Sequence, residues 1–289
     1  MNFVAETPAA YAVGYSGAAS RLLAASHVGP LAPGAPPGAG GLRLAPGASL
    51  CGWRDVRGVI RCNLIAVSTA NSSITSLQLS GPAGHLEALL NAGKPEATYA
   101  ALVCHPHPMY GGTLHNKVVF HAMKALNSFG FPVLRFNFRG AGLSQGEHDN
   151  GMGEVDDVST ALNWLEQRFH LPMIFAGFSF GAAVGLRAAC PDPRVRAVIA
   201  LGVPVAPADE RTYEFDFLQS CAKPKLFISG ARDQFGPRTK LEPLVNSLPD
   251  PKKLVFIEGA DHFFAGRLRE VREAIEDWIK DVLSVQTPP

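Results

Sequence analysis

The stretch from Met173 to Gly181, MIFAGFSFG, constrains the fold of this chain more than any other. A short apolar run ends in GFSFG and is followed at once by a small-residue segment with helical character, AAVGLRAAC. This order predicts a strand that turns sharply into a helix, with Ser179 at the turn. The glycines two residues before and after the serine lack the Cβ atoms that would collide with neighbouring backbone. A serine can occupy an ordinary turn, so a chemical role for Ser179 depends on finding its partners.

From Ile74 onward the chain alternates between strand and helix patterns. The segment ITSLQLSGPAGHLEALLN shows apolar alternation around a Gly-Pro-Ala-Gly turn, which predicts an antiparallel hairpin. Continuous apolar runs and helical periodicity then alternate. We expect strands at 99–104, 131–138, 173–176, 195–203, 225–229 and 253–258, and helices at 118–126, 154–169, 181–190, 241–248 and 268–282. The pattern predicts an α/β fold: a mostly parallel twisted sheet, helices on both faces, and the first hairpin as an antiparallel N-terminal edge.

The N-terminal quarter has a different composition. Residues 29–47 contain eleven Gly or Pro in nineteen positions, and the first lysine of the chain is Lys94. Such a segment is typical of a linker or a poorly ordered region. We therefore expect residues 1–70 to be a poorly ordered Gly/Pro/Ala-rich extension, or sequence upstream of the true start, and residues 71–286 to be the folded domain.

Composition excludes several classes of partner. The net charge is +1, which provides no field for steering nucleic acid. No run of about 18 apolar residues predicts a membrane span, and the first residues lack the basic segment of a secretory signal. Five cysteines, an odd number without C-x-x-C spacing, favour a reducing compartment. We expect a cytoplasmic protein that acts on a small molecule; monomer and homodimer both stay open.

Two strand ends carry the partners that Ser179 would need. A serine hydroxyl is a poor nucleophile unless a base takes its proton and an acceptor orients that base. In a parallel sheet such groups come from loops at the carboxyl ends of strands. The run KLFIS leads into GARDQ, with Asp233, and LVFIE leads into GADHF, with His262. The order Ser179, Asp233, His262 is that of an α/β-hydrolase triad.

The acid of this predicted triad has alternatives. Asp209 and Asp216 follow the preceding strand and could supply the carboxylate instead of Asp233. Asp261 is a poorer candidate, because a residue adjacent to the histidine rarely points back at its ring. Each residue alone also has an ordinary explanation, since strand-end aspartates often cap turns.

Acyl transfer also needs two donors for the charge that develops on the carbonyl oxygen. One should be the backbone N–H of Phe180, directly after the serine. The other should come from the loop after the 99–104 strand, HPHPMYGGT, where prolines 106 and 108 have no N–H. His107 is therefore the first donor beyond His105. The H-x-H pattern could begin a zinc site, but no third ligand at recognisable spacing follows, so we expect no metal.

These motifs together resemble a known family. CHPHPMYGGTLHNKVV, FNFRGAGLSQG, GFSFG and the loops of Asp233 and His262 are similar to those of compact bacterial α/β-hydrolases related to small carboxylesterases and dienelactone hydrolases. The resemblance covers residues 74–285 and implies ester hydrolysis without a metal or organic cofactor. Dienelactone hydrolases are identified by a cysteine nucleophile, whereas this chain has Ser179 at that position.

The sequence thus predicts a serine hydrolase that cleaves carboxylic esters or thioesters through an acyl-enzyme. About twenty residues separate the 195–203 and 225–229 strands, where larger esterases insert a cap, so we expect a minimal cap and small or short-chain acyl groups. Two alternatives stay open. Triad geometry does not distinguish esters from amides, which leaves a peptidase or amidase, and a non-catalytic binding protein with the same fold is the other.

Overall fold

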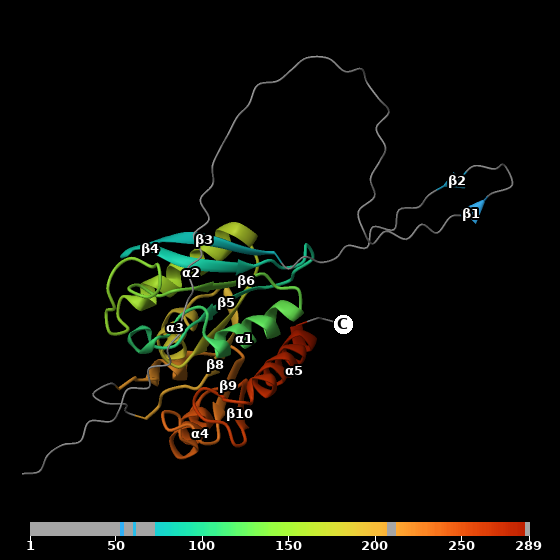
Figure 1. Cartoon of the computed structure of the whole chain (residues 1–289). Helices are drawn as coiled ribbons and strands as arrows, with labels where there is room; N and C mark the ends of the chain where they lie inside the picture. Colours follow the sequence, from blue (N-terminus) through green and yellow to red (C-terminus); the bar gives the residue numbers. More distant parts are fainter. Residues whose placement is uncertain (1–52, 55–59, 62–72, 207–211, 287–289) are drawn as a thin grey trace, which may run out of the picture. The chain divides into compact units, whose positions relative to one another are not determined.

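The computed structural model describes residues 53–54, 60–61, 73–206 and 212–286 (Figure 1), with side chains described in 73–206 and 212–282. The chain divides into two units, Met1–Val67 and Ser68–Pro289. In the first unit, β1 (Trp53–Arg54) pairs antiparallel with β2 (Ile60–Arg61). The rest of the predicted extension lies outside the described residues, so its character stays a prediction.

The second unit contains the mixed sheet that the sequence predicts. Within residues 73–206 and 212–286, eight strands lie in the order β10-β9-β8-β7-β5-β6-β4-β3. Strands β10 to β6 along this order are parallel, and β4 and β3 are antiparallel at one edge. Their bounds are β3 (Ile74–Gly81), β4 (Gly84–Asn91), β5 (Ala100–Cys104), β6 (Val133–Phe136), β7 (Met173–Phe178), β8 (Val195–Leu201), β9 (Lys225–Gly230) and β10 (Lys252–Ile257).

Helices cover both faces of this sheet (Figure 1). One apolar core holds residues of α2 (Glu154–Phe169), α3 (Phe180–Ala189) and α4 (Arg238–Ser247) against one face. A second core holds residues of α1 (Lys117–Ser128) and α5 (Leu268–Gln286) against the other. The central strands β5 and β7 are buried along their whole length, because helices cover both of their faces. The predicted fold class is confirmed.

Among the predicted strands, 131–138 differs most from the structure. The apolar run 131–138 predicts eight extended residues, whereas β6 spans only Val133–Phe136. Pro132 has no N–H and precedes the strand. At the other end, the Phe138 N–H donates to a side chain, His105 Nε2, at 3.0 Å. The strand therefore ends before Phe138, whose backbone N–H is bound by the His105 side chain instead of by a neighbouring strand.

The connection between β8 and β9 is short, as the predicted minimal cap requires. Its described residues contain one short 3-10 helix, η2 (Asp216–Ser220). Residues 207–211, which include the alternative acid Asp209, lie outside the described part of the chain. In the portion that the structure describes, no helix is long and apolar enough to cross a membrane.

Candidate active site

The turn between β7 and α3 holds Ser179 in a strained conformation. Its φ is 54° and its ψ is −117°, a combination that costs a non-glycine residue of the order of 1–3 kcal/mol and persists only where packing enforces it. That packing is visible at Gly181, where an added Cβ would lie 2.4 Å from the His105 carbonyl oxygen and 2.7 Å from that of Cys104. The first turn of α3 thus lies directly on the end of β5.

His262 connects Ser179 to Asp233. Ser179 Oγ lies 3.0 Å from His262 Nε2, and Asp233 Oδ2 lies 2.8 Å from His262 Nδ1. Because a carboxylate only accepts, Nδ1 carries the proton and Nε2 is left to accept the Ser179 hydroxyl. The structure therefore brings together the three side chains that the sequence singled out, in the orientation that proton transfer from the serine requires.

Asp233 is held rigidly for this contact. It is 2% exposed. Its Oδ1 accepts the N–H groups of Phe235 and Gly236 at 2.8 and 3.1 Å, and the Ser229 hydroxyl lies 3.2 Å from Oδ2. These bonds stabilise a buried carboxylate that would otherwise be costly.

The other acids considered for this position differ in placement. Asp216 lies in η2 and is exposed. Asp261 accepts the backbone N–H groups of Phe263 and Ala265, so it closes the turn that carries His262. Among the described carboxylates, Asp233 is the one hydrogen-bonded to the His262 ring.

Aromatic rings enclose the His262 imidazole. The rings of Phe178, Phe235 and Phe263 have centroids 5.1, 4.7 and 5.2 Å from it, and the histidine is 3% exposed. Tight packing of this kind restricts the ring to one rotamer. The imidazole is therefore already in position before a ligand arrives.

The HPHP loop lies beside the serine turn. His107 is the N-cap of the 3-10 helix η1 (Pro108–Tyr110), and its ring centroid lies 4.8 Å from that of Phe180. Phe180 is the first residue of α3, so its N–H has no carbonyl of the preceding turn to bond within the helix. The two residues predicted as backbone donors are thus neighbours at this turn.

His105 is a buried residue of the core. It is 0% exposed, its Nε2 accepts the Phe138 N–H, and its Nδ1 lies 2.6 Å from the Pro106 carbonyl oxygen. Burial lowers the pKa of His105 to about 4, against the bond to Pro106, which raises it, while nearby His107 lowers it further. Both ring nitrogens are occupied by backbone partners, as expected of a neutral structural histidine.

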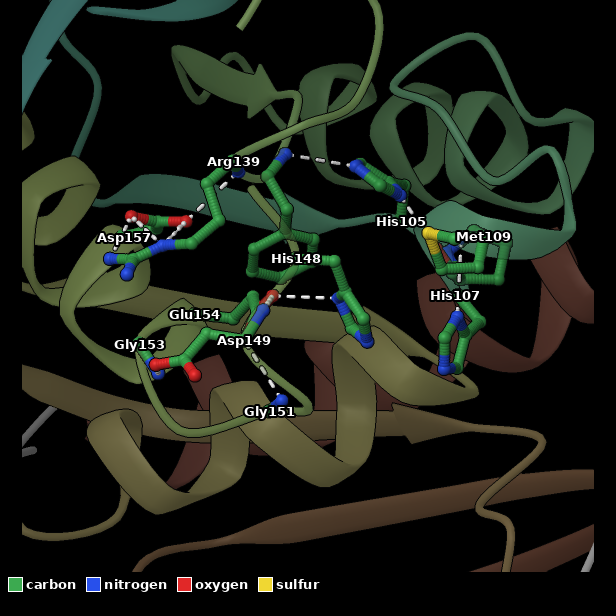
Figure 2. A network of polar contacts seen from close by, with 12 residues as sticks. His105, His107, Met109, Arg139, His148, Asp149, Gly151, Gly153, Glu154 and Asp157 are labelled. Carbon is green, nitrogen blue, oxygen red and sulfur yellow. Dashed lines mark hydrogen bonds and ion pairs between the residues drawn. The ribbon is translucent and has the colours of Figure 1, made fainter. Parts of the chain in front are cut away.

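The glycine-rich loop between β6 and α2, residues 139–153, is anchored by the first turn of α2 (Figure 2). Asp157 accepts from the Arg139 guanidinium at 2.8 Å and from the Arg139 backbone N–H at 3.0 Å. The hydrogen bond to Asp157 raises the pKa of Arg139. Both side chains are largely buried. The start of the loop is therefore tied to the helix by a buried ion pair.

Glu154 anchors the end of the same loop. Its two oxygens accept the N–H groups of Asp149 and Gly151, both at 2.8 Å, and it is 0% exposed. Acids at the start of a helix commonly serve the helix dipole. That explanation is incomplete, because Glu154 and Asp157 are buried anchors while Asp156 is exposed.

His148 lies between Glu154 and the residues next to Ser179. Its Nδ1 lies 2.7 Å from Glu154 Oε1 (Figure 2). Its ring centroid lies 4.8 Å from that of His107 and 5.5 Å from that of Phe180. Sequence reasoning missed this residue, because a histidine in a glycine-rich loop gives no periodic or strand-end signal. The two histidine rings and Phe180 form one packed group.

Two hollows flank this group. One of about 770 Å³ lies along α3, lined by Ala183, Val184 and Arg187, and reaches η2. A second of about 660 Å³ lies beside η1, where Met109 and Tyr110 line it. His107 and His148 line both hollows. The exposed apolar side chains of Met109 and Tyr110 thus line the second hollow, and that of Met152 lines the first.

Within the described residues, no group of three or more His, Cys, Asp or Glu side chains could hold a metal ion. His105, the first histidine of the H-x-H pattern, has both nitrogens engaged with backbone groups.

Fold and geometry together define a hydrolase of the α/β class, and comparison with known proteins agrees. Residues 110–286 match the model of the alpha/beta hydrolase domain family. An uncharacterized protein of Rickettsia prowazekii is 38% identical over 216 residues, which cover 72% of this chain and 90% of that protein. The chain belongs to the α/β-hydrolase family.

Solved structures show the same relationship. An alpha-beta serine hydrolase homologue from Coxiella burnetii is 38% identical, with a TM-score of 0.65 over 70% of this chain and 96% of that one. A putative alpha/beta hydrolase from Agrobacterium tumefaciens is 32% identical, with a TM-score of 0.68 over 74% and 100%. A serine hydrolase from Xanthomonas campestris, described as lacking a lid, is 32% identical, with a TM-score of 0.65 over 75% and 98%.

The buried ion pair at the start of the loop gives a stability prediction. Replacing Arg139 by Met leaves the Asp157 carboxylate buried without its charged partner, which should lower the free energy of unfolding by about 3–5 kcal/mol. The matched control is Arg267→Met, which breaks an exposed pair with Glu270 and should cost less than about 1 kcal/mol. Urea denaturation followed by circular dichroism measures both; equal losses would contradict the role given to Arg139.

His105 gives a pH prediction. In the unfolded chain a histidine takes up a proton below about pH 6.5, whereas folded His105 does so only near its pKa of about 4. The unfolded state therefore binds more protons between about pH 4 and pH 6.5. The free energy of unfolding has its full value above this range and falls by roughly 3 kcal/mol as the pH drops through it. In His105→Phe this loss is absent, so the two stability–pH curves should converge toward acid. Parallel curves would contradict the assignment.

Proposed function

We propose that this chain is a serine esterase, which hydrolyses carboxylic esters or thioesters of small or short-chain acyl groups through an acyl-enzyme. The observation that carries the proposal is the pair of short contacts that His262 makes, to Ser179 Oγ at 3.0 Å and to Asp233 Oδ2 at 2.8 Å. The serine hydrolase descriptions of the Coxiella and Xanthomonas relatives support it.

The mechanism follows from the protonation states. Ser179 Oγ attacks the ester carbonyl while His262 Nε2 accepts its proton, and Asp233 stabilises the imidazolium that forms. His262 then gives the proton to the leaving alkoxide or thiolate, which leaves Ser179 acylated. A water molecule attacks the acyl-enzyme by the same sequence, with His262 again as the base, and the carboxylic acid leaves.

The developing oxyanion would be held by two backbone donors. The Phe180 N–H lies at the positive N-terminal end of α3, which favours negative charge. The second donor would be the His107 N–H, in the loop whose ring packs against Phe180. Loss of one such donor typically costs about 10²–10³ in rate, so the rate should depend on the placement of this loop as well as on the triad.

The surroundings favour small apolar acyl or alcohol groups. Met109, Tyr110 and Met152 are exposed and line the two hollows beside His107 and His148. The described β8–β9 connection contains no helix larger than η2. Because the described part of this connection is too small to enclose a long chain, binding energy must come from contacts close to the ester. The hollow along α3 begins at Ala183, one helical turn beyond Ser179.

The proposal predicts the behaviour of one variant. Ser179→Ala removes the attacking oxygen and should lower kcat for p-nitrophenyl acetate by at least about 10³-fold, with KM little changed. A small phosphonate probe should modify wild-type protein once and fail to modify the variant; intact-mass measurement follows both.

The control is Ser80→Ala, at an exposed position on the edge strand β3, which should keep wild-type rates and labelling. Undiminished hydrolysis by Ser179→Ala, at matched purity, would rule out the mechanism.

A further inference from the structure

His105 takes no chemical part in the proposed mechanism. Its ring nevertheless contacts the backbone of the HPHP loop, which carries the proposed second oxyanion donor. It follows β5 directly and is clamped from both sides: the Phe138 N–H, just beyond β6, donates to Nε2 at 3.0 Å, and Nδ1 lies 2.6 Å from the Pro106 carbonyl oxygen. Its ring also packs edge-on against Phe138, at 4.8 Å. The imidazole therefore joins the ends of two neighbouring strands to the HPHP loop.

The tautomer of this ring follows from its partners. A backbone N–H can only donate, so Nε2 must be the unprotonated nitrogen and Nδ1 must carry the hydrogen. Nδ1–H therefore donates to the Pro106 oxygen. This fixes the direction of the carbonyl in the peptide between Pro106 and His107.

Fixing that carbonyl fixes the donor on the other side of the peptide. In a trans peptide the C=O and the N–H point in opposite directions, and among the described residues the one cis peptide is Asp250-Pro251. With the Pro106 oxygen turned toward the His105 ring, the His107 N–H points away from it. The His107 carbonyl is itself held by the N–H groups of Tyr110 and Gly112.

We propose that His105 is the positioning residue of the oxyanion hole: through Nδ1–H it turns the Pro106–His107 peptide so that the His107 N–H faces the developing oxyanion. This inference rests on the proposed function. His105 itself, 0% exposed, touches no substrate. The role differs from ordinary core packing, because it needs a hydrogen-bond donor at one defined atom rather than a ring of a given volume.

Two variants separate these roles. In His105→Phe the ring volume is kept and the donor is lost; in His105→Asn the side-chain amide takes the place of Nδ1–H while much of the volume is lost. The expected kcat for p-nitrophenyl acetate falls about 10–100-fold in the Phe variant, with KM within about threefold, and the Asn variant keeps most of the wild-type kcat.

Stability should follow the opposite order, because the Asn variant leaves a cavity and the Phe variant fills the space. Thermal unfolding measures this for both. An activity order that simply follows the stability order, or a Phe variant with wild-type kcat, would overturn the proposal. His85→Ala, at an exposed histidine on β4, is the control and should match wild type in both measurements.

Two further measurements keep the test independent of folding and of the proposed function. Nitrogen NMR of histidine-labelled wild-type protein should show His105 as the Nδ1–H tautomer, and an Nε2–H tautomer would refute the positioning role without any variant. Ser179→Ala is assayed alongside. If it is inactive while His105→Phe keeps full kcat, the positioning role alone fails; if it is active, the esterase mechanism itself fails.

Discussion

The contact between the first turn of α3 and the end of β5 is the constraint on which the rest of the site depends. Gly181 lies so close to the carbonyls of Cys104 and His105 that no side chain fits between them. This packing enforces the positive φ of Ser179 and at the same time brings the HPHP loop against Phe180. One close approach of two backbones therefore positions both the predicted nucleophile and the predicted donors.

The surrounding loops hold this arrangement through buried polar groups. Asp233 has four hydrogen-bond contacts that fix it under His262. On the other side, Glu154 and Asp157 fix both ends of the loop that carries His148. Such satisfied networks stabilise one conformation, since each unpaired member would be costly. The two sides of the site are thus held by the β9–α4 loop around Asp233 and by the first turn of α2.

Part of this could be read from the sequence. Ser179, Asp233 and His262 were identifiable because each follows an apolar strand, and parallel strands place their carboxyl ends at one edge of a sheet. The roles of Glu154, Asp157 and His148 were not, because a glycine-rich loop has no period and its conformation depends on contacts distant in sequence. A helix start with three acids does not reveal which two are buried.

His105 and the short β6 show the same limit. The H-x-H pattern suggests metal ligation equally well, and only the position of the Phe138 N–H in space reveals the tautomer. The apolar run 131–138 is longer than β6 because the Phe138 N–H donates to the His105 side chain, and no sequence pattern indicates that bond. Sequence patterns report burial and direction of the chain; they do not report which donor a buried acceptor takes.

The central claim is that the backbone beside Ser179 is already arranged to receive an oxyanion. A crystal structure of the protein inactivated with a small alkyl phosphonate tests it directly, because the phosphoryl oxygen occupies the oxyanion position. We predict phosphorus on Ser179 Oγ, with that oxygen about 2.7–3.1 Å from the backbone nitrogens of Phe180 and His107, and the His105 contacts unchanged. A phosphonate attached to another residue, or an oxygen directed away from both nitrogens, would contradict the account.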